Sequence, residues 1–185
     1  MELYTERLIL RPWVESDAQS LYEYAKDERI GPAAGWPAHT CVENSRYIIM
    51  TSLSVPETYA VCLKEDNKAV GAVGLKIGGH SSFGLPNTEA EIGYWIGVPF
   101  WGRGLIPEAV NEIIRRAFVD LRLETLWCGY YDGNERSKRA MEKCGFRYHH
   151  TKKDVHRALM GDFCTEHVTR LTREEWESRS AAAGV

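Results

Sequence analysis

The chain has 185 residues, of which 44% are hydrophobic and 26% charged, and its formal net charge is −3. This balance fits one globular domain with a sizeable core and gives no electrostatic reason to expect a nucleic acid as the main partner. No apolar run approaches the roughly 18 residues of a membrane span, and the first residues lack the layout of a signal peptide. The five cysteines contain no CxxC pair, which favours reduced thiols over disulfides or a zinc site. These features predict a cytoplasmic protein that does not contact a membrane.

Helix and strand patterns alternate along the first half of the chain. Two apolar periodic stretches are each preceded by a polar residue with a capping-box partner three residues later. A strand is predicted over residues 5–13, ended by Pro12, and then a helix to about Lys26 that Ser16 caps with Gln19. Residues 30–39 are irregular, and Trp36 among them is packed or borders a cleft. A helix to about Leu53, capped by Thr40 with Glu43, and a strand hairpin over residues 59–64 and 69–77 follow. A loop follows over residues 78–87.

Residues 89–109 are the most informative about chemistry. An apolar and aromatic run over residues 92–96 leads to Gly102, Gly104 and Pro107, after which apolar residues recur at spacings of three and four up to Leu121. The pattern predicts a strand, a glycine turn and a helix that starts at Pro107, because a proline in the first turn costs no hydrogen bond. The free N–H groups of a first helical turn favour phosphate, and glycines let a ligand approach the backbone.

Three phosphate-binding motifs can be compared with this turn. A dinucleotide fingerprint requires a third glycine where Pro107 stands, and a Walker A loop requires Gly-Lys-Ser/Thr, which is absent. The third motif is the pyrophosphate loop of the GCN5-related N-acetyltransferases (GNAT), Gln/Arg-x-x-Gly-x-Gly/Ala. Residues 101–106 resemble it, with departures at Trp101 and Ile106. A tight turn without a ligand is the alternative.

The second half of the chain continues with strands around one more helix. A strand is predicted over residues 125–131, followed by a helix over residues 135–143 that Asn134 caps and Gly145 ends. Closing strands are predicted over residues 146–151 and 164–171, and residues 173–185 as a frayed tail. No repeat or linker indicates a second domain.

Further motifs extend the resemblance to the RimJ/RimL-like branch of the GNAT superfamily. They are the opening Thr-Glu-Arg-Leu-x-Leu-Arg-Pro at residues 5–12, Tyr94-Trp95-Ile96, Glu108-Ala109, and Asn134-x-x-Ser137 followed by Glu-Lys-x-Gly-Phe at residues 142–146. The resemblance implies an α/β (α+β) fold whose mixed, mostly antiparallel sheet is flanked by helices and splayed at its centre, between the strand that ends at Ile96 and the strand that begins near Thr125. It implies one acyl-CoA N-acyltransferase domain over residues 1–172 and a tail over residues 173–185.

The resemblance also implies the substrates. Acetyl-CoA would be the acyl donor, lying in the splay without any metal, and a primary amine would receive the acetyl group by direct transfer. The acceptor would be a protein N-terminus, such as that of a ribosomal protein, or a small amine. The residues implied to bind acetyl-CoA are Tyr94, Trp95 and Ile96 along the pantetheine, Trp101, Gly102, Arg103, Gly104, Leu105 and Ile106 around the pyrophosphate, and Asn134.

Catalytic roles follow from the same resemblance. Glu91 is the first candidate for the base that deprotonates the amine, and Glu89, on the same strand face, is the second; a structural role for Glu91 is the alternative. Met141 occupies the position where many family members have a tyrosine acid, so Ser137 is the candidate donor of a proton to the leaving thiolate, or else a helix residue that binds backbone. A late carboxylate typical of RimL-like proteins is missing, since Arg157 falls near its place.

Several features leave alternatives open. Arg103, Lys138 and Arg139 either contact phosphates or form a solvated face. Residues 78–87 either border the acceptor site or form a plain surface loop. The late histidines at positions 149, 150, 156 and 167 lack metal-binding spacing, and no cysteine has an evident histidine partner. The other functions considered are a non-catalytic acyl-CoA-binding or sensing module and transfer of another acyl group such as succinyl; a homodimer is also considered.

Overall fold

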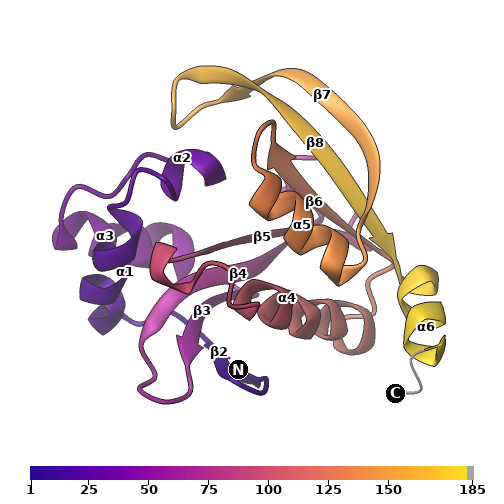
Figure 1. The fold of residues 1–185 in the computed structure, drawn as a ribbon, viewed down its shortest axis with the longest axis horizontal. Coiled ribbons are helices and arrows are strands. Elements are labelled where there is room, and N and C mark those ends of the chain that lie inside the picture. Colours follow the sequence, from indigo (N-terminus) through magenta and orange to yellow (C-terminus); the bar gives the residue numbers. More distant parts are fainter. Residues whose placement is uncertain (183–185) are drawn as a thin grey trace.

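A computed structural model describes residues 1–182 of the chain (Figure 1). Its elements are β1 (Leu3–Tyr4), β2 (Leu8–Arg11), α1 (Ala18–Ala25), α2 (Gly31–Ala34), α3 (Val42–Ile48), β3 (Thr58–Leu63), β4 (Ala69–Ile77), β5 (Glu89–Ile96), α4 (Leu105–Arg115), β6 (Thr125–Tyr131), α5 (Glu135–Cys144), β7 (Arg147–Arg157), β8 (Asp162–Thr172) and α6 (Arg173–Ala182). Wider π-helical turns, Ile49–Leu53 and Arg116–Asp120, extend α3 and α4 to about the predicted ends.

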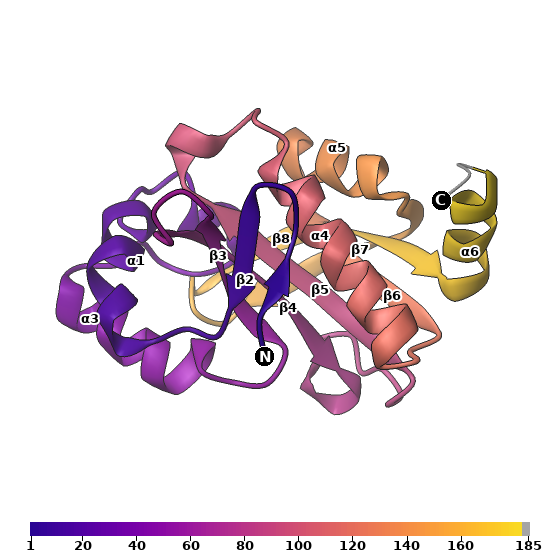
Figure 2. The same ribbon diagram turned by 90° about the horizontal axis from the view of Figure 1, so that it is seen from below.

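The strands form one eight-stranded sheet in the order β1-β2-β3-β4-β5-β6-β8-β7. Every neighbouring pair is antiparallel except β5 and β6, which run parallel. Helices α4 and α5 follow β5 and β6 along the chain, and α4 lies along β4 and β5 (Figure 2). The predicted mixed, mostly antiparallel sheet flanked by helices is therefore confirmed.

Helices cover both faces of the sheet at β3. The side chains of Tyr59 and Val61 belong to the cluster that α4 covers, whereas Ala60 and Cys62 pack with residues of α1 and with Ile49, which follows α3. Successive side chains of a strand point to opposite faces, so a strand covered on both sides is apolar throughout. This explains why the predicted hairpin over residues 59–64 and 69–77 shows so little polar alternation.

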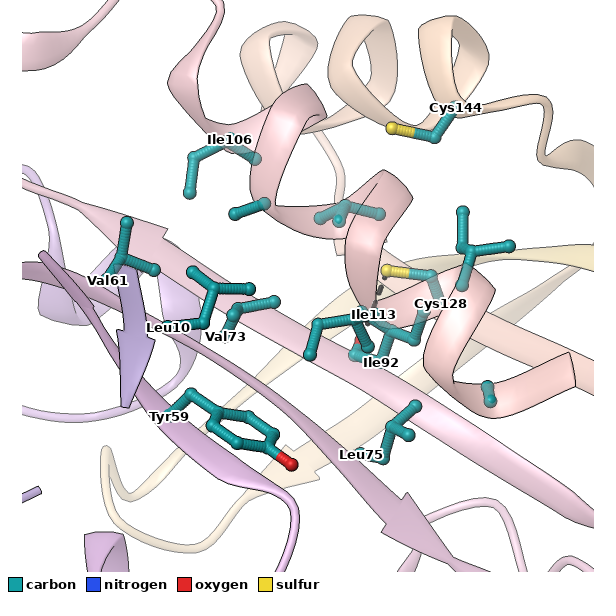
Figure 3. Packing of buried hydrophobic residues seen from close by; sticks show 14 of the residues in the cluster. Leu10, Tyr59, Val61, Val73, Leu75, Ile92, Ile106, Ile113, Cys128 and Cys144 are labelled. Carbon is teal, nitrogen blue, oxygen red and sulfur yellow. Dashed lines mark hydrogen bonds between the residues drawn. The ribbon is translucent and has the colours of Figure 1, made fainter. Parts of the chain in front are cut away.

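The main core lies between α4 and the centre of the sheet. Figure 3 shows Val61, Val73 and Ile92 from the strands directed towards Ile106 and Ile113 of α4. All five are buried, and burial of such a side chain stabilises the fold by about 1.5–3 kcal/mol. The core thereby fixes α4, and with it the loop before α4, against β5.

The caps predicted for two helices have different outcomes. In α5 both are confirmed: the Asn134 side chain accepts the Ser137 N–H at 3.2 Å, and Gly145 ends the helix with φ +95°. In α3 the predicted cap at Thr40 is wrong by one residue. The sulfur of Cys41 accepts the Asn44 N–H at 3.4 Å, while the Thr40 N–H donates to the Asn44 side chain at 3.2 Å.

The end of the chain is more regular than its composition indicates. The closing strands are 11 residues each, longer than predicted, because β7 and β8 pair with each other in a hairpin beyond the end of β6. The frayed tail is wrong for residues 173–182, which form α6. The Trp176 ring packs on Phe118 with ring centroids 5.5 Å apart, and Arg179 donates to the Cys144 carbonyl at 2.9 Å. Residues 183–185 lie outside the described part of the chain.

A buried ion pair, rather than the predicted box of Ser16 with Gln19, organises the start of α1. The Arg11 guanidinium on β2 binds both carboxylate oxygens of Asp17, at 2.7 and 2.8 Å, and Asp17 also accepts the Val14 N–H at 3.1 Å. The side chains of Arg11 and Asp17 are 11% and 8% exposed. A bidentate, charge-assisted pair of this kind is stronger than a hydroxyl cap, so it decides where the helix begins.

Asp17→Ala should lower the free energy of unfolding by about 3–5 kcal/mol, because it leaves the Arg11 charge buried without a counter-charge. Urea denaturation measures this. The control is Asp27→Ala, which removes the partner of Arg29 in an exposed pair and should change stability far less. Equal losses in the two variants would contradict the role given to the buried pair.

Candidate active site

A cleft opens where β5 and β6 separate. The two strands pair at only three positions, Glu89 with Thr125, Ala90 with Leu126 and Glu91 with Trp127, and then diverge. The resulting cleft has a volume of about 670 Å³. Both strands, the loop before α4, the start of α5 and α2 line it. The predicted splay between the strand that ends at Ile96 and the strand that begins near Thr125 is therefore present, and it starts after Glu91 and Trp127.

The loop before α4 presents unpaired backbone donors to this cleft. Gly102 and Gly104 both have φ +75°, a conformation that favours glycine. Within residues 1–182, no backbone N–H from Gly102 to Ile106 donates a hydrogen bond to another residue. Helix α4 begins at Leu105, two residues before the predicted start, and Pro107 still falls within the first turn. Five consecutive free donors at a helix N-terminus form a site suited to a diphosphate.

The chain's opening residues hold this loop in place. Glu108 of α4 accepts hydrogen bonds from the Thr5 hydroxyl at 2.6 Å and from the Arg7 N–H at 2.8 Å, and the Arg7 guanidinium binds both Glu108 and the Arg103 carbonyl. Burial acts to raise the pKa of Glu108, but these hydrogen bonds keep it below its usual value. Two motifs far apart in sequence, residues 5–12 and Glu108-Ala109, thus form one clamp on the loop.

Aromatic and basic side chains surround the loop. The Trp101 indole donates to the Ile96 carbonyl at 3.0 Å, which ties the loop to the end of β5, and the Arg136 guanidinium lies 3.7 Å from the Trp101 ring centroid. Of Arg103, Lys138 and Arg139, for which the sequence allows either phosphate contact or a solvated face, Arg139 lines the cleft. Arg103 lies over the Phe100 ring instead.

Tyr94 and Ser137 bring two hydroxyl groups together on the α5 side of the cleft. Their oxygen atoms lie 3.0 Å apart, and the Tyr94 hydroxyl also donates to the Ser137 carbonyl at 3.2 Å. Burial raises the pKa of Tyr94 well above its usual value, so its hydroxyl stays protonated. Sequence reasoning placed Tyr94 beside the ligand through its backbone and missed this contact, because β5 and α5 meet only in the fold.

Asn134 lines the cleft, and its side chain already forms two hydrogen bonds within the protein. Besides capping α5, its amide donates to the Ala33 carbonyl at 3.3 Å, and Arg157 from the β7–β8 hairpin donates to the Pro32 carbonyl at 2.7 Å. Both contacts hold α2 against the cleft; Figure 1 shows α2 below the tip of this hairpin. Trp36, which follows α2, lines the cleft as predicted and packs on Trp95.

Glu91 lines the cleft with its carboxylate held by neighbours. One oxygen accepts from the Ser81 hydroxyl at 2.9 Å and from the Ser82 N–H and hydroxyl at 2.9 and 3.0 Å, while the other lies 3.4 Å from the Lys76 ammonium. These bonds fix the loop over residues 78–87 to β5. Glu89, the second candidate, accepts a short hydrogen bond from the Trp127 indole.

A second carboxylate, which sequence reasoning missed, lines the cleft from β8. Glu166 is half-buried. Burial is the main reason why the pKa of Glu166 is raised above its usual value, and the nearby Glu91 charge adds to it. Polar alternation along the predicted strand over residues 164–171 placed Glu166 on one face, but nothing local showed that this face opens on the cleft.

Two cysteines lie near the cleft without nucleophilic character. The Cys128 thiol donates to the Ile92 carbonyl at 3.2 Å (Figure 3). Burial raises the pKa of Cys144 to about 12 and that of Cys128 well above its usual value, which disfavours the reactive thiolate. This agrees with the expectation of direct transfer.

Within residues 1–182, none of the helices combines the length and apolar character needed to cross a membrane. The same residues contain no group of three His, Cys, Asp or Glu side chains that could hold a metal ion.

Comparison with known proteins gives consistent matches. A family model described as an acetyltransferase (GNAT) domain matches residues 7–147. The chain is 28% identical over 161 residues to the uncharacterised N-acetyltransferase p20 of Bacillus licheniformis, covering 84% of this chain and 88% of that protein. Among solved structures, a GNAT-family acetyltransferase from Bacillus anthracis has a TM-score of 0.81 at 22% identity, covering 94% of this chain and 99% of that one. Mycobacterium smegmatis RimJ in complex with CoA-disulfide has a TM-score of 0.77 at 18% identity, covering 100% and 95%.

Proposed function

Because the chain belongs to the acetyltransferase (GNAT) family, we propose that it transfers the acetyl group of acetyl-CoA directly to a primary amine, as a member of the RimJ/RimL-like branch. The observation that carries this proposal is the row of five free N–H groups, Gly102 to Ile106, at the mouth of a cleft between two diverging strands. We place the enzyme in the cytoplasm; association as a homodimer stays a prediction.

Different parts of the cleft suit the diphosphate and the pantetheine of acetyl-CoA. The five N–H groups would bind the diphosphate, and the glycines leave room for it: a Cβ added at Gly102 would meet nothing within 4 Å, and one at Gly104 only Arg7 at 3.7 Å. Arg136, Arg139 and Lys143 line the same side and supply positive charge. The pantetheine would lie along Tyr94, Trp95 and Ile96, where β5 has left β6. The complex of RimJ, a protein of the same fold, with CoA-disulfide supports a coenzyme A derivative as the ligand.

Transfer from a thioester to an amine requires three proton or charge movements. The ammonium must lose a proton before its nitrogen can attack, the tetrahedral oxyanion needs a hydrogen-bond donor, and the departing thiolate takes a proton. We assign the last step to the Ser137 hydroxyl, which Tyr94 orients through their 3.0 Å contact. For the first step, two carboxylates line the cleft, Glu91 and Glu166; Glu91 remains the prediction from sequence.

The acceptor is proposed to be a protein N-terminus or a small amine. Isotopically labelled acetyl-CoA added to a cell extract with the protein should place the label on one class of molecule, which mass spectrometry identifies. Release of free thiol with that acceptor should then require the protein. Competition with succinyl-CoA tests the acyl group. Thermal stabilisation by acetyl-CoA without thiol release for any acceptor would favour a binding or sensing module instead.

Gly104→Glu should abolish acetyl-CoA binding, because it places bulk and negative charge where the diphosphate would lie. Isothermal titration calorimetry measures the affinity. Gly161→Glu is the matched control, since Gly161 also has a positive φ, of +69°, and open space around it, but lies in the β7–β8 turn. Unchanged affinity in Gly104→Glu would remove the loop assignment, and equal losses in both variants would indicate backbone strain.

Ser137→Ala should lower turnover by roughly 10²-fold, the lower end for a positioned general acid, with little change in acetyl-CoA affinity. Steady-state kinetics and calorimetry separate the two quantities. Because the Ser137 backbone N–H bonds Asn134, the alanine variant keeps that capping contact. A parallel loss of affinity and turnover would make Ser137 structural.

A further inference from the structure

We propose that Glu166 is the residue that accepts the proton of the acceptor amine. This inference rests on the proposed function and names the catalytic base of the same site. It differs from the expectation that Glu91 or Glu89 on β5 has this role. Four features of the structure support it: position, accessibility, lack of partners and charge environment.

The position of Glu166 follows from strand geometry. On β8 its neighbour in register is Tyr131 of β6, and its side chain lies over Gly129. A Cβ added at Gly129 would come within 2.4 Å of the Glu166 carboxylate oxygen, so the carboxylate occupies the space that the missing side chain leaves open. Gly129 comes two residues after Trp127, where the pairing of β6 with β5 ends. The carboxylate therefore lies at the beginning of the splay.

The opposite wall of the splay is also open. Gly93 on β5 follows the last paired residue, Glu91, by two positions and shares its face of the strand. A Cβ added at Gly93 would meet nothing within 4 Å. Two glycines, Gly93 and Gly129, thus leave space on either side of the strand opening, and Glu166 borders that space.

Glu166 has no competing partner, unlike Glu91. Within residues 1–182, no hydrogen bond or ion pair reaches its carboxylate. The two nearest cations have other contacts: the Lys152 ammonium lies 4.3 Å from the Phe83 ring centroid, and Lys76 pairs with Glu91. The Glu91 carboxylate, by contrast, accepts three hydrogen bonds on one oxygen. A base must have a free lone pair at the moment of proton transfer, which Glu166 has.

The charges that face Glu166 favour a cationic guest. Burial and Glu91 raise the pKa of Glu166, and Lys152 and Lys76 oppose them; the net direction is upward. Glu166 in turn acts to raise the pKa of Tyr131. The charge of Glu166 also acts to raise the pKa of Cys128 and of Cys164. A raised pKa makes the carboxylate a stronger proton acceptor and brings it closer to the operating pH, where a general base is most effective.

Aromatic rings complete a site for an ammonium group. Trp36, Trp95 and Tyr131 line the cleft together with Glu166, and the rings of Trp36 and Trp95 are 5.8 Å apart. Aromatic faces attract cations, so the acceptor would enter protonated. One ammonium proton passes to Glu166, the nitrogen lone pair forms the bond to the acetyl carbon, and the C–S bond breaks. The thiolate takes the Ser137 proton, and the second proton that the nitrogen loses on becoming an amide restores the Ser137 hydroxyl through solvent. Glu166 then releases its proton to solvent through the cleft.

The decisive experiment compares Glu166→Gln and Glu91→Gln across pH, with the acceptor identified by labelling. Without a base, only the neutral fraction of the amine reacts. At pH 7 the kcat/KM of Glu166→Gln should therefore be lower than that of the unaltered protein by roughly tenfold for an N-terminal amine and by about 10³-fold for a lysine-type amine. The deficit should shrink tenfold per pH unit and vanish near the pKa of the amine. A merely structural defect would give a deficit that does not depend on pH.

Thermal stability supplies an independent measurement. Because the pKa of Glu166 is raised in the folded protein, the folded state holds this proton more tightly than the unfolded chain, and its contribution to stability is lost as pH rises through the folded-state value. Glu166→Gln should thus have a higher Tm than the unaltered protein at pH 7, with no difference below pH ~4. Glu91→Gln should lower Tm, since it weakens the bonds to Ser81 and Ser82.

The outcomes separate this proposal from the proposed function. A Glu166→Gln variant as active as the unaltered protein at pH 7, or a deficit independent of pH, would overturn the assignment of Glu166 alone. A pH-dependent deficit confined to Glu91→Gln would give the role to Glu91. If the unaltered protein binds acetyl-CoA but acetylates no acceptor, both proposals fall.

Discussion

The short contact between β5 and β6 is the constraint on which the site depends. Parallel pairing lasts for three residues and ends at Glu91 and Trp127, and the two strands then diverge inside a sheet that is otherwise continuous. Divergence leaves β5 without strand pairing to β6 beyond Glu91. A sheet interior tolerates such a break only where side chains, a ligand or water satisfy the backbone groups, as Cys128 and Trp101 do for the Ile92 and Ile96 carbonyls. The core around α4 stabilises this arrangement from one face, and α1 with α3 from the other.

The proposed diphosphate site depends on contacts that lie outside it. Free N–H groups at Gly102 to Ile106 are useful only if the loop keeps its shape, and glycines by themselves make a loop flexible. The clamp of Thr5 and Arg7 on Glu108 and on the Arg103 carbonyl supplies that rigidity. The N-terminal strand hairpin, β1 and β2, thus supports the proposed site although it does not line the cleft.

Glu91 and Glu166 illustrate how environment separates two identical side chains. Glu91 is hydrogen-bonded to a loop and paired with Lys76, so it organises the structure. Glu166 is half-buried and unpaired within the described residues, which costs stability when it is ionised. Unpaired titratable groups in clefts, with a pKa shifted by burial and a nearby charge, are typical of functional sites. The proposed base is therefore a position where stability and activity are opposed.

Local sequence determined the strand, glycine turn and helix around residues 89–121, the caps of α5 and the family resemblance, because φ preferences, helix caps and apolar spacing act over a few residues. Only the tertiary structure decided the start of α1, the helical end of the chain, the contact of Tyr94 with Ser137 and the free carboxylate of Glu166. Each of these depends on a partner far away in sequence. The spacing of residues along the chain does not predict such partners, because they meet only when the sheet and its helices have packed.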